Sequence, residues 1–255
     1  AGPFIGGYIY ENYSTATVFN TMSIMVAISL VLTILFVPDE QSMDVPSRQS
    51  PAPVREILGN RVLSSVLVYR GVNALGRGTI MSFLPLFAVQ ILGLSSTHIG
   101  VVLSTGIFLT AFLQTPMGIL ADRYNRKLLL VAGGLIASSG YFYMVQTGTI
   151  AEIFVARMIV SLGGALSLPA VTAIIAEEGK KLGSGSTVGV FNTAMSIGQI
   201  VGPVLSGFLL DIYGMGSVFY FSGFIGVLSV TSFWVMSRTY VMRKPSPPTH
   251  IRGDA

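Results

Sequence analysis

The chain has 255 residues, of which 51% are hydrophobic and only 10% are charged. Soluble domains carry a charge at about 25% of their positions, so this chain lacks the residues needed to cover a soluble globule with a hydrated surface. The absence of cysteine excludes disulfides, thiolate metal sites and cysteine nucleophiles. We therefore expect an all-α integral membrane protein, a multi-pass helical bundle whose surroundings are the lipid bilayer.

Seven apolar stretches are each long enough to cross a bilayer as a helix, which takes about 20 residues. Five of them carry no charge, whereas the second contains Arg70 and Arg77 and the fifth contains Arg157. Between the first and second stretches, residues 39–61 are polar and include three prolines, which predicts a linker. In chain order the stretches are 12–38, 62–94, 99–121, 128–151, 153–176, 182–210 and 212–237.

The basic residues outside these stretches all lie on one side of the expected bundle. Of the 15 lysines and arginines, three lie within the apolar stretches, and the other 12 lie in the linker, the loops after the third and fifth stretches, and the C-terminal segment. By the positive-inside rule this side is cytoplasmic, and so is the tail 239–255. This placement accounts for the net charge of +4 without a nucleic-acid partner.

An internal repeat relates the start of the chain to its end. Residues 1–19 align on residues 201–219 without a gap. Several aligned positions are identical, and Glu11 aligns with Asp211, which keeps the negative charge. Such duplication is typical of transporters, and an offset of 200 implies halves of about 200 residues with about 140 residues in front of Ala1. We therefore expect residues 1–38 to end an N-terminal half and residues 62–238 to form a six-helix C-terminal half.

The loop after the third stretch carries a ten-residue motif. It reads GILADRYNRK from Gly118 to Lys127 and resembles the loop motif of the major facilitator superfamily of transporters, with Asn125 where the family usually has glycine. Both residues tolerate a left-handed conformation. An aspartate here can sit against a helix N-terminus, and an arginine can bridge to it. The resemblance, which extends over nearly all of residues 1–240, implies a latch for the outward-facing state formed by Gly118, Asp122, Arg123, Arg126 and Lys127.

Two glycine–proline motifs resemble the helix pattern G-x-x-x-G-P-x-x-G-G of the same family. The sixth stretch contains the pattern with Ser206 in place of one glycine, and a truncated copy opens the chain. In the family, the copy in the fifth of twelve helices is associated with antiporters. Small residues at these spacings allow helix backbones to pack closely. The residues that we assign to helix packing are Gly2, Pro3, Gly6, Gly7, Gly198, Gly202, Pro203 and Gly207.

The embedded arginines point to a cavity. An arginine inside a membrane helix costs about 2.5–3.5 kcal/mol on insertion scales, so it is normally paired or faces water. Arg157 begins a segment that resembles a family R-x-x-x-G-x-G motif, and the resemblance implies that its helix and the second one line a central cavity. Arg70 could instead snorkel to the membrane surface, and interhelical hydrogen bonds could account for the neutral polar residues. The candidates for substrate binding or coupling are Arg77, Asn73, Arg157, Arg70, Ser161, Gln114, Asn192 and Gln199.

The resemblance implies a secondary active transporter in the cell membrane, which moves a small molecule by alternating access and needs no catalytic residue, metal or cofactor. Proton-coupled efflux is the leading hypothesis, and the arginines leave uptake of an anionic metabolite as the alternative. No acidic residue lies deep in any apolar stretch, so a proton-binding carboxylate would lie elsewhere. The missing cysteines and the missing N-P-x-x-Y motif argue against a seven-helix receptor. A channel would differ in showing no saturable counterflow.

Overall fold

The computed structural model describes residues 2–36 and 53–237, which fold entirely into helices and their connections. Seven of these helices are long and apolar enough to cross a membrane, which confirms the all-α multi-pass class. The helices are α1 (Gly2–Asn12), α2 (Thr15–Phe36), α3 (Val54–Gly59), α4 (Arg61–Gln90), α5 (Ser96–Arg123), α6 (Arg126–Met144), α7 (Ile150–Leu182), α8 (Ser184–Tyr213) and α9 (Met215–Ser237).

The clearest differences from the predicted stretches are in α6 and α7. α6 ends at Met144 rather than at residue 151, and a capping box between Thr149 and Glu152 then starts α7. α7 continues past residue 176 to Leu182, because charged side chains end the apolar run without ending the helix. Hydropathy therefore located these segments, whereas local hydrogen bonds and helix propensity set their ends.

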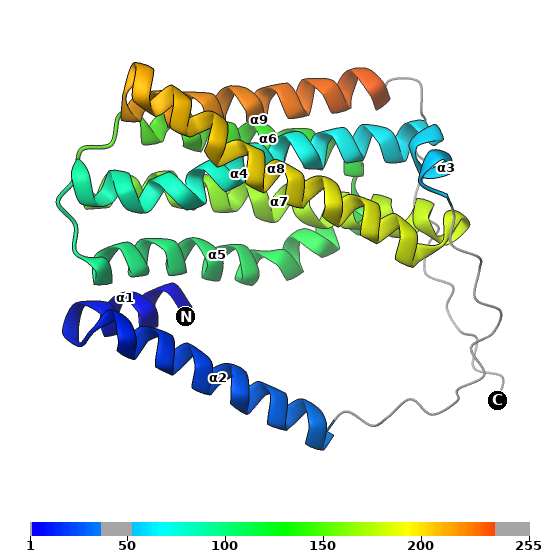
Figure 1. Ribbon diagram of the computed structural model, residues 1–255. Coiled ribbons are helices and arrows are strands. Elements are labelled where there is room, and N and C mark those ends of the chain that lie inside the picture. The colour runs from blue at the N-terminus through cyan, green and yellow to red at the C-terminus, as the bar shows by residue number, and fades with distance from the viewer. Residues whose placement is uncertain (1, 37–52, 238–255) are drawn as a thin grey trace.

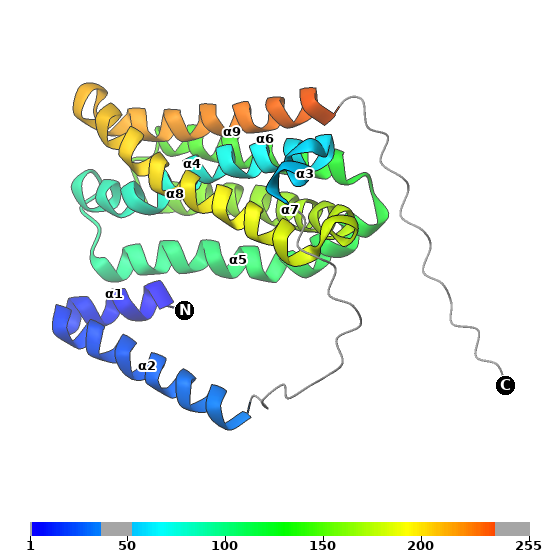
Figure 2. The same cartoon turned by 45° about the vertical axis from the view of Figure 1, so that its right-hand side comes forward.

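Helices α4 to α9 form one bundle, in which α4 runs parallel to α8, α5 runs parallel to α7, and helices consecutive in the chain run antiparallel (Figure 1). α6 packs against α7 and α9, α4 packs against α8 and α9, and α5 packs against α7. α1 lies along the outer side of α5, and α2 packs on α1 and leads away from the bundle, as the rotated view also shows (Figure 2). The face of α5 opposite α7 is therefore the one that receives the N-terminal helices.

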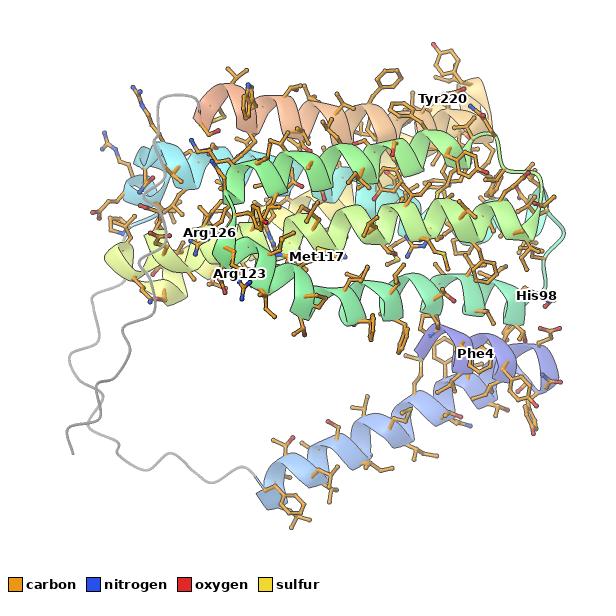
Figure 3. All side chains as sticks on the ribbon, turned by 180° about the vertical axis from the view of Figure 1, so that it is seen from behind. Phe4, His98, Met117, Arg123, Arg126 and Tyr220 are labelled. Atoms are coloured by element: carbon orange, nitrogen blue, oxygen red, sulfur yellow. The ribbon has the colours of Figure 1, made fainter. Side chains whose placement is uncertain are left out.

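Two apolar clusters fill the two ends of the bundle. One includes Leu63, Leu130 and Phe233, and the other includes Leu84 and Phe219; all five side chains are almost fully buried. The first cluster lies at the end where Arg123 and Arg126 gather, called here the basic end, and His98 and Tyr220 mark the opposite end (Figure 3). The middle of the bundle, between the clusters, is left for the polar residues.

The last part of the predicted linker is structured. Residues 39–52 of that linker and the tail 239–255 lie outside the described residues, but 54–59 form α3. Ile57 of α3 is 1% exposed and joins the cluster at the basic end. Asn60 then caps α4, accepting hydrogen bonds from the backbone N–H groups of Val62 and Leu63 at 3.0 and 3.2 Å. The chain is thus anchored before it enters the bundle.

The predicted repeat reappears in the helix boundaries. α1 ends at Asn12 and α2 begins at Thr15, while α8 ends at Tyr213 and α9 begins at Met215, so the break recurs at an offset of about 200. The neighbours of the two copies differ, because α1 packs on α5 and α8 packs on α4. The repeated sequence therefore encodes a helical hairpin that is used in two packing environments.

Candidate functional site

A cavity of about 320 Å³ lies midway between the two apolar clusters, surrounded by α4, α5, α6, α7 and α8. All three embedded arginines line it, together with neutral polar side chains from α4, α5 and α7. Of the eight residues that the sequence proposed for substrate binding or coupling, six line this cavity: Arg70, Asn73, Arg77, Gln114, Arg157 and Ser161.

Arg157 is the most buried of the three arginines, with 7% of its surface exposed. Its guanidinium lies on Gly106 of α5, where a Cβ atom would come 2.9 Å from the guanidinium carbon. The hydroxyl of Ser161, one turn later on α7, donates to the carbonyl oxygen of Gly106 at 2.9 Å. The missing side chain of Gly106 thus lets α5 and α7 approach and makes the space that Arg157 occupies.

The two arginines of α4 differ in exposure. Arg77 is exposed on the open side of the cavity, whereas Arg70 is half-buried, with a terminal nitrogen 3.5 Å from the sulfur of Met195. The Nε atoms of Arg70 and Arg157 are buried, and neither has a hydrogen-bond partner in the described structure. Asn73 lies between Arg70 and Arg77 on the same face of the helix.

No aspartate or glutamate of the described chain lines the cavity. The three guanidinium groups therefore give it a strongly positive lining, softened only by neutral polar side chains. Its remaining wall is largely apolar and includes Ile80, Met81, Ile107 and Leu168. The arrangement can hold a molecule that combines a polar, electron-rich group with a hydrophobic body.

The structure places two candidates of α8 elsewhere. Asn192 and Gln199 are exposed, and Met195, which lies between them along the helix, is the α8 residue that lines the cavity. Phe191 and Gly198 are the residues of α8 that face the bundle interior at this level. Asn192 and Gln199 follow them directly in the chain and therefore point away from the cavity. They lie on the surface of the described chain.

The predicted latch forms a charged cluster at the basic end. Nη1 of Arg126 lies 2.6 Å from Oε2 of Glu177 on α7, whereas Asp122 is 3.9 Å from the same guanidinium and has a 74% exposed side chain. Lys127 donates to the carbonyl oxygen of Ser237 at 2.5 Å. Among the described residues, the cluster therefore ties the start of α6 to the ends of α7 and α9.

Three further residues of the loop motif differ in their roles. Arg123 is exposed, and no atom comes within 4 Å of a Cβ atom built on Gly118, so the described chain shows no close helix approach there. Asn125 has φ −67°, so the left-handed conformation tolerated by both glycine and asparagine is not used. Instead its side chain caps α6 by accepting from the backbone N–H of Lys127 at 2.9 Å. Asparagine at this position therefore supplies a side-chain cap that glycine could not provide.

In the glycine–proline motifs, some glycines contact a neighbouring helix and others do not. Gly198 and Gly202 of α8 lie against the backbone of α4, and Gly7 of α1 lies against the backbone of α5. Ser206, which departs from the family pattern, shares a buried 2.7 Å hydrogen bond with the hydroxyl of Thr79 on α4. The remaining glycines, Gly2, Gly6 and Gly207, have no neighbour within 4 Å of a built Cβ in the described chain, and Pro3 and Pro203 lie within α1 and α8.

Residues 66–253 match the family described as Major Facilitator Superfamily, which is more than half of the chain. The chain belongs to the major facilitator superfamily. This superfamily consists of transporters rather than enzymes, and the protein is accordingly an integral multi-pass membrane protein. The loop motif that carried the resemblance and the seven predicted spans are both present in its structure.

Several curated relatives in the superfamily are similar over much of this chain. An uncharacterized MFS-type transporter, MJ1560 of Methanocaldococcus jannaschii, is 30% identical over 67% of the chain and 44% of its own length. Multidrug resistance protein MdtG of Serratia proteamaculans is 33% identical over 66% and 41%. Multi-drug resistance efflux pump PmrA of Streptococcus pneumoniae is 29% identical over 56% and 37%. The matched part of the chain thus spans less than half the length of these relatives.

Besides Gly106, sequence reasoning missed three side chains of this superfamily member. Tyr69 and Tyr141 line the cavity, and Glu177 is the short-range partner of Arg126. A tyrosine inside an apolar helix is a usable signal, since a buried hydroxyl needs a polar neighbour. No local pattern pairs Glu177 with Arg126, because the two lie 51 positions apart and meet only through the packing of α6 on α7.

Proposed function

We propose that this protein exports a small organic molecule across the membrane by alternating access. The single observation that carries the proposal is the mid-bundle cavity, closed by an apolar cluster toward each end and lined by arginine and neutral polar side chains. Substrate sites of secondary transporters lie near the bilayer midplane between two halves. A relative named as a multidrug resistance efflux pump, PmrA, and one named as a multidrug resistance protein, MdtG, favour export as the direction.

In this proposal, residues 1–38 end one half, residues 39–61 link the halves and residues 62–238 form the other half. The exposed side of Arg77 faces the remaining half, and the charged cluster around Arg126 holds the basic end of the C-terminal half together as the halves rock. Because these 255 residues contain no cysteine, single cysteines placed among them can test their orientation. A thiol at Ser184 should react only from the cytoplasm and one at Gly148 only from outside; labelling of both from one side contradicts the proposed topology.

We further propose that protons drive export. Since no described acidic residue lines the cavity, the carboxylate that couples protons to export belongs to the other half of the protein or lies near the ends of the helices described here. The transport test uses full-length protein in proteoliposomes, with cationic, neutral and anionic radiolabelled aromatic compounds. Saturable efflux, counterflow and loss of accumulation on adding a protonophore are expected. Flux that rises linearly with concentration and shows no counterflow would instead indicate a pore.

Uptake of an anionic metabolite is the second candidate, favoured by the three arginines in one cavity. The two candidates differ in the direction of net movement under an imposed proton gradient. Substrate that moves in the same direction as the protons and accumulates on the side that they enter supports uptake. Substrate that moves in the direction opposite to the proton flow supports export.

A further inference from the structure

Arg157 presents an unbalanced charge inside the bundle. Only 7% of the residue is exposed, its Nε atom has no hydrogen-bond partner in the described structure, and no described acidic residue lines the cavity around it. Burying an unpaired charge is costly, and buried charges are usually paired. The two other arginines of the same cavity add to the positive potential instead of relieving it.

The position of Arg157 is built into the contact between two helices. The guanidinium occupies the space above Gly106, and Ser161 fastens α7 to the carbonyl oxygen of that same glycine at 2.9 Å. An arginine held in this way loses little freedom when it binds an oxyanion through two of its oxygens. The contact is therefore suited to recognition of an anionic group.

We infer that the cavity binds an organic anion: a carboxylate, sulfonate or phosphate group at Arg157, with an apolar body against the hydrophobic wall. The inference rests on the proposed function and names the substrate class of that same cavity. Arg70 and Arg77 supply the surrounding field, and the wall that includes Ile107 and Leu168 accepts the apolar part. Gly106 is a positioning residue, because it acts on the ligand only through Arg157.

The experiment compares two probes that share one shape and differ in charge. Binding of naphthalene-1-sulfonate and of naphthalene-1-sulfonamide to detergent-purified full-length protein is measured by titration calorimetry. Charge-assisted hydrogen bonds to a buried guanidinium should make the sulfonate bind about tenfold more tightly or better. Equal affinities, or no binding of either probe, would overturn the inference, since a carboxylate from another part of the protein would then neutralise Arg157.

Substitutions test whether Arg157 causes the preference for the sulfonate over the sulfonamide. Arg157→Gln should bring the affinity ratio of the two probes close to one, and Arg157→Lys, which keeps the charge without the planar fork, should give an intermediate ratio. Gly106→Ala should lower the ratio by displacing the guanidinium. Gly189→Ala is the matched control, because a Cβ atom there meets nothing within 4 Å and the residue lies outside the cavity lining.

An undiminished preference for the sulfonate in Arg157→Gln would overturn the inference even if Gly106→Ala does not fold. The binding measurement is also independent of transport. Preference for the anion without counterflow would refute the proposed function and keep the site, whereas counterflow without a preference for the anion would do the reverse.

Discussion

Replacing Gly202 by alanine tests how closely α4 and α8 pack. A Cβ atom at this position would lie 2.8 Å from the carbonyl carbon of Leu75, 2.9 Å from its Cα atom, and closer still to its carbonyl oxygen. These are backbone atoms of a helix, so they cannot rotate away, and α8 has to move outward. Overpacking of this kind costs about 1–3 kcal/mol, which for a chain of this size corresponds to a fall in melting temperature of roughly 2–12 °C.

The assay is thermal unfolding of purified protein in detergent, followed by size-exclusion chromatography of the surviving fraction. Gly207→Ala is the control, because it changes the same residue type in the same motif and helix, yet a Cβ atom there meets nothing within 4 Å. The control should leave the melting temperature unchanged. Equal melting temperatures for the two variants would refute the packing argument.

Three other substitutions test separate contacts. Asp122→Asn removes a charge from an exposed side chain and should leave expression intact while cutting transport about fivefold or more; near-normal transport would contradict the latch. Ser206→Ala leaves the buried hydroxyl of Thr79 without its partner and should lower stability by about 0.6–1.7 kcal/mol, with no further loss when Thr79→Val is added. Glu11→Gln weakens the 2.9 Å hydrogen bond that Glu11 accepts from the first turn of α5. Because this bond holds α1 to α5 at the end of the bundle marked by His98, thiol labelling at that end should accelerate. Asp211→Asn, at the matching repeat position, should not change the labelling rate.

Much of the fold could be predicted because membrane insertion leaves a local record. A bilayer-crossing helix must satisfy its backbone hydrogen bonds internally and present apolar side chains throughout, so hydropathy alone identified the seven spans. α3 was not predicted, since six residues among prolines have too short a pattern. What stabilises this helix is Ile57, whose burial depends on α4 and α8 rather than on its own sequence.

The site was predicted in part, for a related reason. Periodicity showed that Arg70 and Arg77 share a face, and the cost of buried charge indicated that this face meets a cavity. Periodicity does not show how far along a helix the cavity extends, and Asn192 and Gln199, which the sequence grouped with it, lie on the surface of the described chain, where their predicted role stays a prediction. The role of Gly106 was equally hidden, because it depends on a side chain of another helix.

The three guanidinium groups of the cavity also bear on the energy source. If the cargo is a monoanion, its exit from a compartment with a negative interior is electrically downhill by about 2.3 kcal/mol per 100 mV. A proton that enters in exchange carries charge in the same electrical sense, so each cycle would move two elementary charges. Export would then continue on the membrane potential alone, with no pH difference, whereas one-for-one exchange of a monovalent cation for a proton would be electrically silent.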